Sequence, residues 1–275
     1  MIIMGDCLKS ISKIDKGSIQ SVITSPPYWG LRDYDNEIQL GQEDTPEEFV
    51  SKLVEIFSEI KHVLRDDGTV WVNIGDTYFG AKGGHFDSDN SITNNASGSE
   101  FRMQRKAPPK HKYLKVKDLS GVPWMFAFAM QKQGWYLRQD IIWHKPNPMP
   151  EAVNDRMQKS HEHIFLFSKK KKYYFDAEAI GTKKKDGEGW VRRQDVWDIQ
   201  TSSFQGAHFA VFPEKLPELC IKASTKENDI VLDPFMGSGT TAYVAQRLSR
   251  RWVGIELNPE YVKIINKRTA QQELF

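Results

Sequence analysis

The chain has 275 residues, of which 39% are hydrophobic and 27% are charged, and its formal net charge at pH 7 is only +2. A chain of this length can bury a sizeable core, and no apolar run approaches the roughly 18 residues that a membrane-spanning helix needs. The near balance of charge excludes a bulk polycation that wraps nucleic acid. We therefore expect one α/β domain with insertions, and no membrane partner.

The two cysteines, Cys7 and Cys220, lie far apart in the chain and lack the spacing of metal ligands. This usage is typical of a reducing compartment and argues against a disulfide framework or a zinc site. The first residues have no basic segment followed by a small-residue cleavage site, so nothing suggests export. We expect a cytoplasmic protein that holds no metal.

The first part of the chain alternates predicted strands with a predicted helix. Residues 1–4 are apolar, residues 18–24 are rich in β-branched side chains, and residues 69–74 form a third apolar run. A capping box at Thr45-Pro46-Glu47-Glu48 begins a helix between the last two strands. A strand, a helix and a strand in this order predict a right-handed parallel unit.

A regular α/β pattern continues further along the chain. We predict helices over 122–135, 213–223, 240–248 and 259–267, and strands over 136–143, 163–167, 229–232 and 252–255.

Two segments interrupt this pattern. Residues 79–120 join a loop rich in Gly, Ser and Asn to a basic stretch, and residues 168–205 carry lysine runs with aromatic residues between them. Lys and Arg neutralise phosphates without reading sequence, although a solvated surface is the alternative interpretation. We predict DNA contacts from basic side chains of these segments and of one proline-rich loop, namely Arg102, Arg105, Lys106, Lys145, Lys170, Lys171, Lys172, Lys184, Arg192 and Arg193.

A glycine-rich turn at residues 233–241, Asp-Pro-Phe-Met-Gly-Ser-Gly-Thr-Thr, follows a hydrophobic strand and opens a helix. Glycines let the backbone approach a ligand, and a helix start offers free N–H groups. Glu256 ends the next predicted strand, where a carboxylate can accept hydrogen bonds from both ribose hydroxyls of a nucleoside. No Lys follows the second glycine, which excludes a P-loop. Asp233 suits a methionine ammonium and would repel a pyrophosphate; alternatively, Asp233 only caps the helix.

A second strand ends at Ser25-Pro26-Pro27-Tyr28. An exocyclic amino group of a base is a poor nucleophile, and two acceptors that hold its hydrogens, here the Ser25 hydroxyl and a proline carbonyl, can aim its lone pair at a methyl donor. Tyr28 offers a face for stacking an extruded base, worth about 1–3 kcal/mol, and we expect the ring rather than the hydroxyl to matter. The alternative is a strand that ends in a proline turn with a packed aromatic side chain.

These two motifs, in this order and some 200 residues apart, resemble those of the amino-methylating DNA methyltransferases of the β arrangement. In that family the (Asp/Asn/Ser)-Pro-Pro-(Tyr/Phe/Trp) motif is catalytic and the Asp-Pro-Phe-x-Gly-Ser-Gly-Thr-Thr motif binds S-adenosylmethionine. Residues 5–8 resemble the stretch whose Asp approaches the cofactor adenine, residues 208–216 the segment that covers the methionine end, and residues 143–150 a loop near the target base.

The resemblance implies two sets of site residues. Ser25, Pro26, Pro27 and Tyr28 are expected to be catalytic. The residues expected to bind the cofactor are Asp6, Asp233, Pro234, Phe235, Gly237, Ser238, Gly239, Thr240, Thr241 and Glu256.

The resemblance also implies a fold and a reaction. We expect one methyltransferase domain over residues 1–275 with a mostly parallel, seven-stranded Rossmann-like sheet, circularly ordered so that the catalytic half comes first. Residues 79–120 would be a loop and basic insertion, and residues 168–205 a target-recognition region. The expected partner is double-stranded DNA, and a homodimer and a companion restriction endonuclease are left open.

The family variant with Ser before Pro-Pro is typically associated with cytosine N4, and that with Asp is associated with adenine N6. We therefore expect methylation of cytosine N4, with adenine N6 as the alternative. Methylation of cytosine C5 needs a cysteine nucleophile, usually after Pro, and neither cysteine follows a proline. An RNA or protein methyltransferase of the same fold and a non-catalytic nucleic-acid-binding module are the rival functions.

Overall fold

The computed structural model describes residues 1–30, 39–80, 110–184, 187–201 and 212–270. Their elements, in chain order, are β1 (Ile2–Met4), α1 (Cys7–Ile11), β2 (Ile19–Thr24), α2 (Pro46–Val63), β3 (Leu64–Ile74), α3 (Val122–Lys132), β4 (Tyr136–His144), β5 (His161–Ser168), β6 (Thr182–Lys183), β7 (Trp190–Val191), β8 (Val196–Asp198), α4 (Lys215–Ser224), β9 (Ile230–Asp233), α5 (Thr240–Arg247), β10 (Arg251–Glu256) and α6 (Pro259–Ala270).

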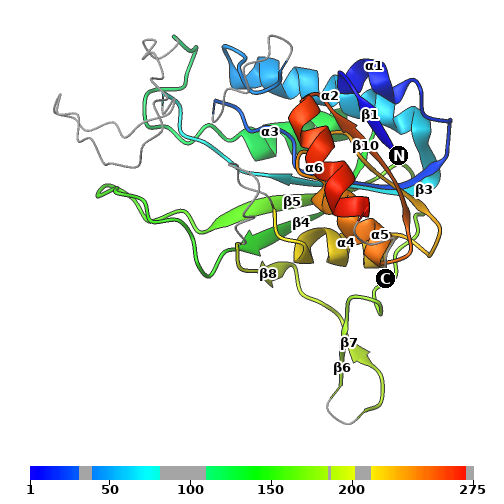
Figure 1. Ribbon diagram of the computed structural model, residues 1–275. Coiled ribbons are helices and arrows are strands. Elements are labelled where there is room, and N and C mark those ends of the chain that lie inside the picture. The colour runs from blue at the N-terminus through cyan, green and yellow to red at the C-terminus, as the bar shows by residue number, and fades with distance from the viewer. Residues whose placement is uncertain (31–38, 81–109, 185–186, 202–211, 271–275) are drawn as a thin grey trace.

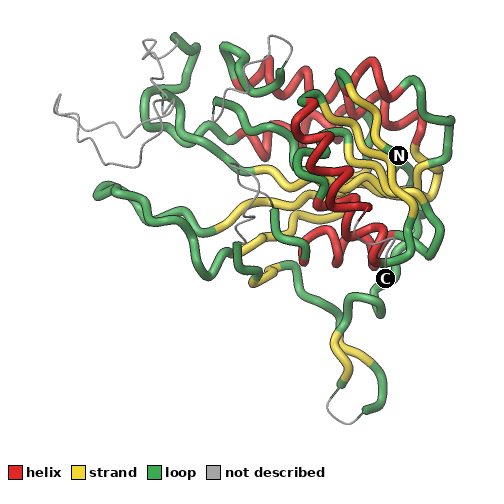
Figure 2. Tube along the Cα trace, viewed as in Figure 1, coloured by secondary structure: helices red, strands yellow, loops and turns green. Residues whose placement is uncertain are grey.

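One large sheet forms the centre of the molecule (Figures 1 and 2). Its strands lie in the order β1-β10-β9-β2-β3-β5-β4-β8. Neighbouring strands are parallel from β1 to β3, β5 is antiparallel to both β3 and β4, and β8 is parallel to β4. The carboxyl ends of β1, β10, β9, β2, β3 and β4 therefore share one edge of the sheet, which we call the site edge.

The sheet confirms the predicted fold class and the circular order of its strands. It has eight strands in the described residues, one more than predicted, because Val196–Asp198 within the expected recognition region adds the edge strand β8. Strand β3 begins at Leu64, before the predicted strand over residues 69–74, and therefore includes Asp67 and Gly68. There the register between β2 and β3 shifts, between Ile19 and Ser21.

Helix α2 shows why the elements form where they do. Thr45 caps its first turn by accepting a hydrogen bond from the N–H of Glu48 at 3.2 Å, as the capping box predicts, and Pro46 occupies the start of the helix. The apolar side chains of α2 are buried, and Phe57 packs on Phe126 of α3 with ring centroids 5.3 Å apart. A continuous apolar stripe thus joins the helix to the sheet.

Helices cover both faces of the sheet. Side chains of α1, α2 and α3 pack on one face, in a core that contains Val22 and Val70, and side chains of α4 and α5 pack on the other, in a core that contains Ile23 and Trp71. Adjacent residues of one strand thus enter different cores, as the alternation of a strand buried on both sides requires. Among the described residues, no helix is both long and apolar enough to cross a membrane.

Candidate active site

The two sequence motifs meet at the site edge. Strands β2 and β9 are parallel neighbours, with Val22 opposite Leu232. At their ends the Thr24 hydroxyl donates a hydrogen bond of 2.6 Å to Asp233, a residue 209 positions further along the chain. Ser25 and the glycine turn therefore leave the sheet side by side, as the parallel arrangement predicts.

The Asp233 carboxylate is turned into the protein rather than toward a ligand. It is 1% exposed and accepts hydrogen bonds from the hydroxyls of Thr24 and Thr241 and from the N–H of Phe235, at 2.6, 2.7 and 3.0 Å. Burial raises the pKa of Asp233 to about 6, although these hydrogen bonds lower it. The expectation that this carboxylate faces a methionine ammonium is thus corrected: Asp233 fixes the turn and joins it to β2.

This burial predicts a pH dependence of stability. The folded-state pKa of Asp233 lies above its ordinary value of 3.8, so its stabilising contribution is present below that value and is lost as the pH rises through about 6. Relative to Asp233→Asn, which cannot titrate, the wild type should lose about 2–3 kcal/mol of unfolding free energy between pH 4 and pH 7. Denaturant titrations at both pH values measure this difference, and a pH-independent difference would contradict the assignment.

The predicted cofactor residues separate into two groups. Asp6, Phe235, Gly237 and Glu256 are partly exposed at the site edge, where they could touch a ligand. The remaining predicted residues are buried and hold the turn in shape, namely Asp233, Pro234, Ser238, Gly239, Thr240 and Thr241.

Glu256 lies at the centre of the exposed group. Its carboxylate accepts hydrogen bonds from the N–H groups of Gly237, at 2.7 Å, and Asn258, at 2.8 Å. Its carbonyl accepts from the N–H of Gly5, which brings Asp6 beside it. Burial raises the pKa of Glu256, and the backbone N–H groups act against that rise. Two partly exposed carboxylates, Asp6 and Glu256, thus lie at neighbouring strand ends on the site edge.

The glycines of the turn have separate tasks. Gly239 has φ +83°, and a Cβ there would lie 3.0 Å from Ile265 of α6, so the turn packs closely on that helix. Gly237 has φ +53°, and a Cβ there would meet only one atom, at 4.0 Å. The turn is therefore closed on its α6 side and open above Gly237.

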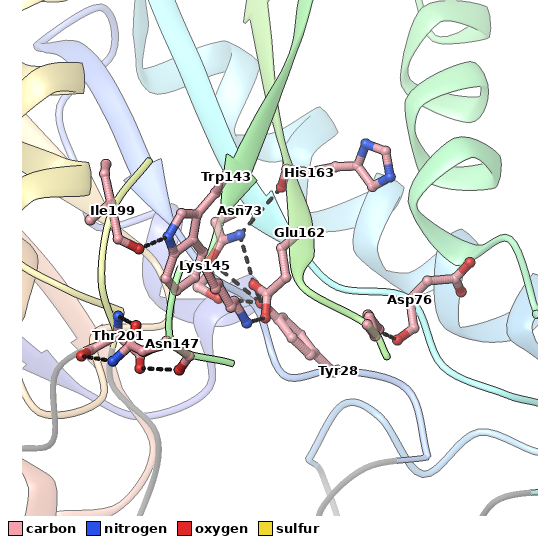
Figure 3. A network of polar contacts seen from close by, with 12 residues as sticks. Tyr28, Asn73, Asp76, Trp143, Lys145, Asn147, Glu162, His163, Ile199 and Thr201 are labelled. Carbon is pink, nitrogen blue, oxygen red and sulfur yellow. Dashed lines mark hydrogen bonds and ion pairs between the residues drawn. The ribbon is translucent and has the colours of Figure 1, made fainter. Parts of the chain in front are cut away.

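The Ser-Pro-Pro-Tyr motif begins a polar network at the same edge (Figure 3). The Tyr28 hydroxyl donates to the Glu162 carboxylate at 2.5 Å, and the Asn73 amide donates to the same oxygen at 3.0 Å. The Lys145 ammonium forms an ion pair with the other Glu162 oxygen. The expectation that only the ring of Tyr28 matters is thus incomplete, because its hydroxyl has a charged partner.

Glu162 and Asn73 are site residues that sequence reasoning missed. Glu162 lies in β5 with its side chain 11% exposed. Burial alone would raise its pKa, but the Lys145 charge and the hydrogen bonds from Lys145, Tyr28 and Asn73 hold the pKa below its usual value. The available signal was a lone carboxylate in a strand, His161–Ser168, whose residues 164–167 are all apolar.

The predicted DNA contact at Lys145 is also corrected. Its side chain is 19% exposed, pairs with Glu162 and lies over the Trp143 ring, 4.4 Å from the centroid. An ammonium that neutralises a buried carboxylate is not available as a free phosphate contact. Lys145 therefore belongs to the network around Tyr28.

The other predicted DNA contacts fall in three places. Arg102, Arg105 and Lys106 lie outside the described residues. The exposed side chains of Lys184, Arg192 and Arg193 flank the β6–β7 hairpin, which projects from the body of the molecule (Figure 1). Lys170, Lys171 and Lys172 follow β5, whose last residue, Ser168, pairs with Thr69 near the start of the apolar part of β3. They therefore lie at the edge opposite the site, which speaks against their predicted role.

Charge reversal at Lys170, Lys171 and Lys172 should consequently change DNA affinity by less than about twofold. These side chains lie roughly 20 Å along the strands from Ser25, and the screening length at physiological salt is about 8 Å. Titration of a labelled duplex with the triple Lys→Glu variant measures the effect. Charge reversal at Lys184 and Arg192 serves as the comparison and should weaken DNA binding. A tenfold loss of affinity in the triple Lys→Glu variant would instead support the predicted DNA contacts at residues 170–172.

Neither cysteine is suited to nucleophilic attack. Burial raises the pKa of Cys7 to about 12 and raises that of Cys220 as well. Within the described ranges, no group of three or more His, Cys, Asp or Glu side chains is arranged to hold a metal ion. The described polar groups at this edge are hydroxyls, carboxylates, the Asn73 amide, the Lys145 ammonium and backbone groups.

Comparison with known proteins identifies the family to which the chain belongs. A family model for DNA methylases, covering N6- and N4-methyltransferases, matches residues 19–267, so the chain belongs to this family. It is 50% identical over 98% of its length to the Type II methyltransferase M.Cfr9I of Citrobacter freundii, covering 87% of that protein. It is 47% identical over 98% of its length to M.SmaI of Serratia marcescens, covering 91% of it.

Solved structures share the fold. The PvuII DNA methyltransferase, which is cytosine-N4-specific, matches with a TM-score of 0.73 and 25% identity, over 98% of this chain and 85% of that one. A DNA modification methylase of Thermus thermophilus, in complex with S-adenosyl-L-methionine, matches with a TM-score of 0.66 and 24% identity, over 98% and 95%. The chain is thus a site-specific, amino-methylating DNA methyltransferase that uses S-adenosyl-L-methionine.

Proposed function

We propose that the chain methylates cytosine N4 at a specific site in double-stranded DNA, with adenine N6 as the alternative. The observation that carries the proposal is the hydrogen bond of 2.6 Å between Thr24 and Asp233, because it brings the end of the Ser-Pro-Pro-Tyr strand beside the glycine turn. The preference for cytosine is supported by Ser25 in place of an aspartate and by the likeness to the PvuII enzyme.

The residues at the site edge fit the cofactor. Carboxylates suit the ribose hydroxyls and the positive charges of S-adenosyl-L-methionine, and we assign the ribose to Glu256 and the adenine end to Asp6. The backbone above Gly237 is open for close approach, and the partly exposed Phe235 offers an apolar contact beside it. Asp233 acts through the turn that it fixes, not through direct contact.

The target amino group is positioned by the Ser-Pro-Pro-Tyr motif. The Ser25 hydroxyl and the Pro26 carbonyl accept its two hydrogens and favour a tetrahedral nitrogen, while the Tyr28 ring stacks on the extruded base. When bound, the cofactor would supply an electrophilic methyl group on a sulfonium, toward which Ser25 and Pro26 would aim the lone pair of the amino nitrogen. No covalent enzyme intermediate is needed, in keeping with the raised pKa of both cysteine thiols.

Transfer of a tritiated methyl group from S-adenosyl-L-methionine to plasmid DNA tests the proposed substrate. We expect label in double-stranded DNA and none in RNA or in a glutamine-containing peptide. Label in RNA alone would overturn the proposal. A homodimer, a companion restriction endonuclease and a cytoplasmic location remain predictions from the sequence.

A further inference from the structure

The polar network around Tyr28 ends in a group that can only accept hydrogen bonds. Glu162 is ion-paired with Lys145, and an ionised carboxylate has no proton to donate. All its contacts within the network are donors: the Lys145 ammonium, the Asn73 amide and the Tyr28 hydroxyl. The direction of each hydrogen bond at this carboxylate is therefore fixed.

That direction is passed on to the motif through Tyr28. A phenol has one proton, and the contact of 2.5 Å assigns it to Glu162 rather than to the Asn73 oxygen at 3.4 Å. The Tyr28 oxygen can then only accept from Ser25, whose hydroxyl lies 3.4 Å away with Ser25 as the donor. This last contact is long for two hydroxyls, and such contacts in ligand-free sites tighten when substrate binds.

We propose that Glu162 is a positioning residue that, through the Tyr28 hydroxyl, fixes Ser25 as a hydrogen-bond acceptor and so makes the site select a base that carries an amino group. A serine hydroxyl on its own can either donate or accept. Once its proton is directed to Tyr28, Ser25 can offer the substrate only its lone pairs, as an acceptor. The inference rests on the role of Ser25 proposed above, and it holds for cytosine and for adenine alike.

The consequence is discrimination by hydrogen-bond polarity. A cytosine or adenine amino group presents N–H donors to Ser25, whereas uracil, thymine and hypoxanthine carry a carbonyl oxygen at the same position. If such a carbonyl oxygen faces a serine that can only accept, two acceptors lie against each other with no proton between them. A site built to hydrogen-bond an amino group therefore binds these carbonyl bases much more weakly. Lys145 contributes by keeping Glu162 ionised and therefore unable to donate.

Two conservative variants test this role. Tyr28→Phe keeps the stacking ring but removes the hydroxyl that links Glu162 to Ser25. Glu162→Gln keeps the shape of the side chain but introduces a hydrogen-bond donor. Each should lower kcat by about 10–100-fold, the range for one hydrogen bond to a charged group, with the Kd for S-adenosyl-L-methionine within about twofold of wild type. Tyr136→Phe and Glu59→Gln, at exposed positions on β4 and α2, are matched controls that should retain activity.

The decisive readout is selectivity, which a merely structural role would not change. The target site is first mapped on methylated plasmid, and two duplexes are then made in which the methylated base is either retained or replaced by its carbonyl counterpart, uracil for cytosine or hypoxanthine for adenine. Wild type should bind the amino duplex more tightly, and both variants should reduce that preference by at least about tenfold. The mismatch introduced by the replacement cancels when the same two duplexes are compared across variants.

The outcomes separate this inference from the proposed function. Suppose that Ser25→Ala abolishes turnover while Tyr28→Phe retains full kcat and the wild-type preference for the amino duplex. The positioning role of Glu162 through Tyr28 is then overturned, and the role of Ser25 stands. If Ser25→Ala has full turnover, the proposed role of Ser25 fails first. Should Glu162→Gln not fold, Tyr28→Phe alone decides, because cofactor binding reports that its fold is intact.

Discussion

Ser25→Ala is expected to lower kcat by about 10²–10³-fold, the effect of removing one positioned hydrogen-bonding group from an active site. The Ser25 hydroxyl acts mainly when the amino nitrogen becomes tetrahedral, so its loss weakens the transition state far more than the bound ground state. The Kd for S-adenosyl-L-methionine should stay within about twofold, because the cofactor residues lie at the ends of β1, β9 and β10 or just beyond them. Single-turnover methylation and calorimetry measure the two quantities.

Ser58→Ala is a matched control for this variant. The Ser58 hydroxyl lies on α2 and donates to the Val54 carbonyl of the same helix at 2.9 Å. Its loss should leave kcat unchanged. Full turnover by Ser25→Ala would remove Ser25 from the mechanism, whereas a large loss of cofactor affinity would mean that Ser25 supports the turn rather than the target base.

Glu256→Ala is expected to raise the Kd for S-adenosyl-L-methionine by about 100-fold. Each hydrogen bond to a charged group contributes about 1.5–3 kcal/mol, and the variant loses those to the ribose together with the support of Gly237 and Asn258. Glu256→Gln keeps one acceptor oxygen and should raise the Kd by only about tenfold. Calorimetric titration with the cofactor measures both values.

Glu260→Gln provides the control for these variants. Glu260 lies in the first turn of α6, and its exposed side chain pairs with Lys263. Cofactor affinity should not change. If Glu256→Ala binds the cofactor as tightly as wild type does, the ribose is held elsewhere and the assignment of the site edge must be revised.

Local patterns predicted most of the fold. The apolar periods, the capping box at Thr45 and the glycine turn each depend on neighbours a few residues apart, and α2, β9 and α5 lie where those patterns place them. Strand β8 was missed because three residues with only Trp197 buried carry no period, and their strand conformation comes from pairing with β4. The strand conformation of β8 therefore depends on tertiary contacts and not on its local sequence.

The two sequence motifs of the site were predicted, but the residues that contact these motifs from distant parts of the chain were missed. Residues 24–28 and 233–241 could be recognised because each motif is continuous in the chain. Glu162 contacts Tyr28 across 134 positions, and no local pattern links them. For the same reason Lys145 and Asp233 were expected to face ligands, since sequence shows a charge but not the group that neutralises or buries it.

The identity of the methylated atom tests the account most directly. DNA is incubated with the wild-type protein and S-adenosyl-L-methionine carrying a trideuterated methyl group, digested to nucleosides and analysed by mass spectrometry. The account predicts deuterated N4-methylcytosine in double-stranded DNA and its near absence after treatment with Ser25→Ala. Deuterated N6-methyladenine as the only product would contradict the cytosine assignment.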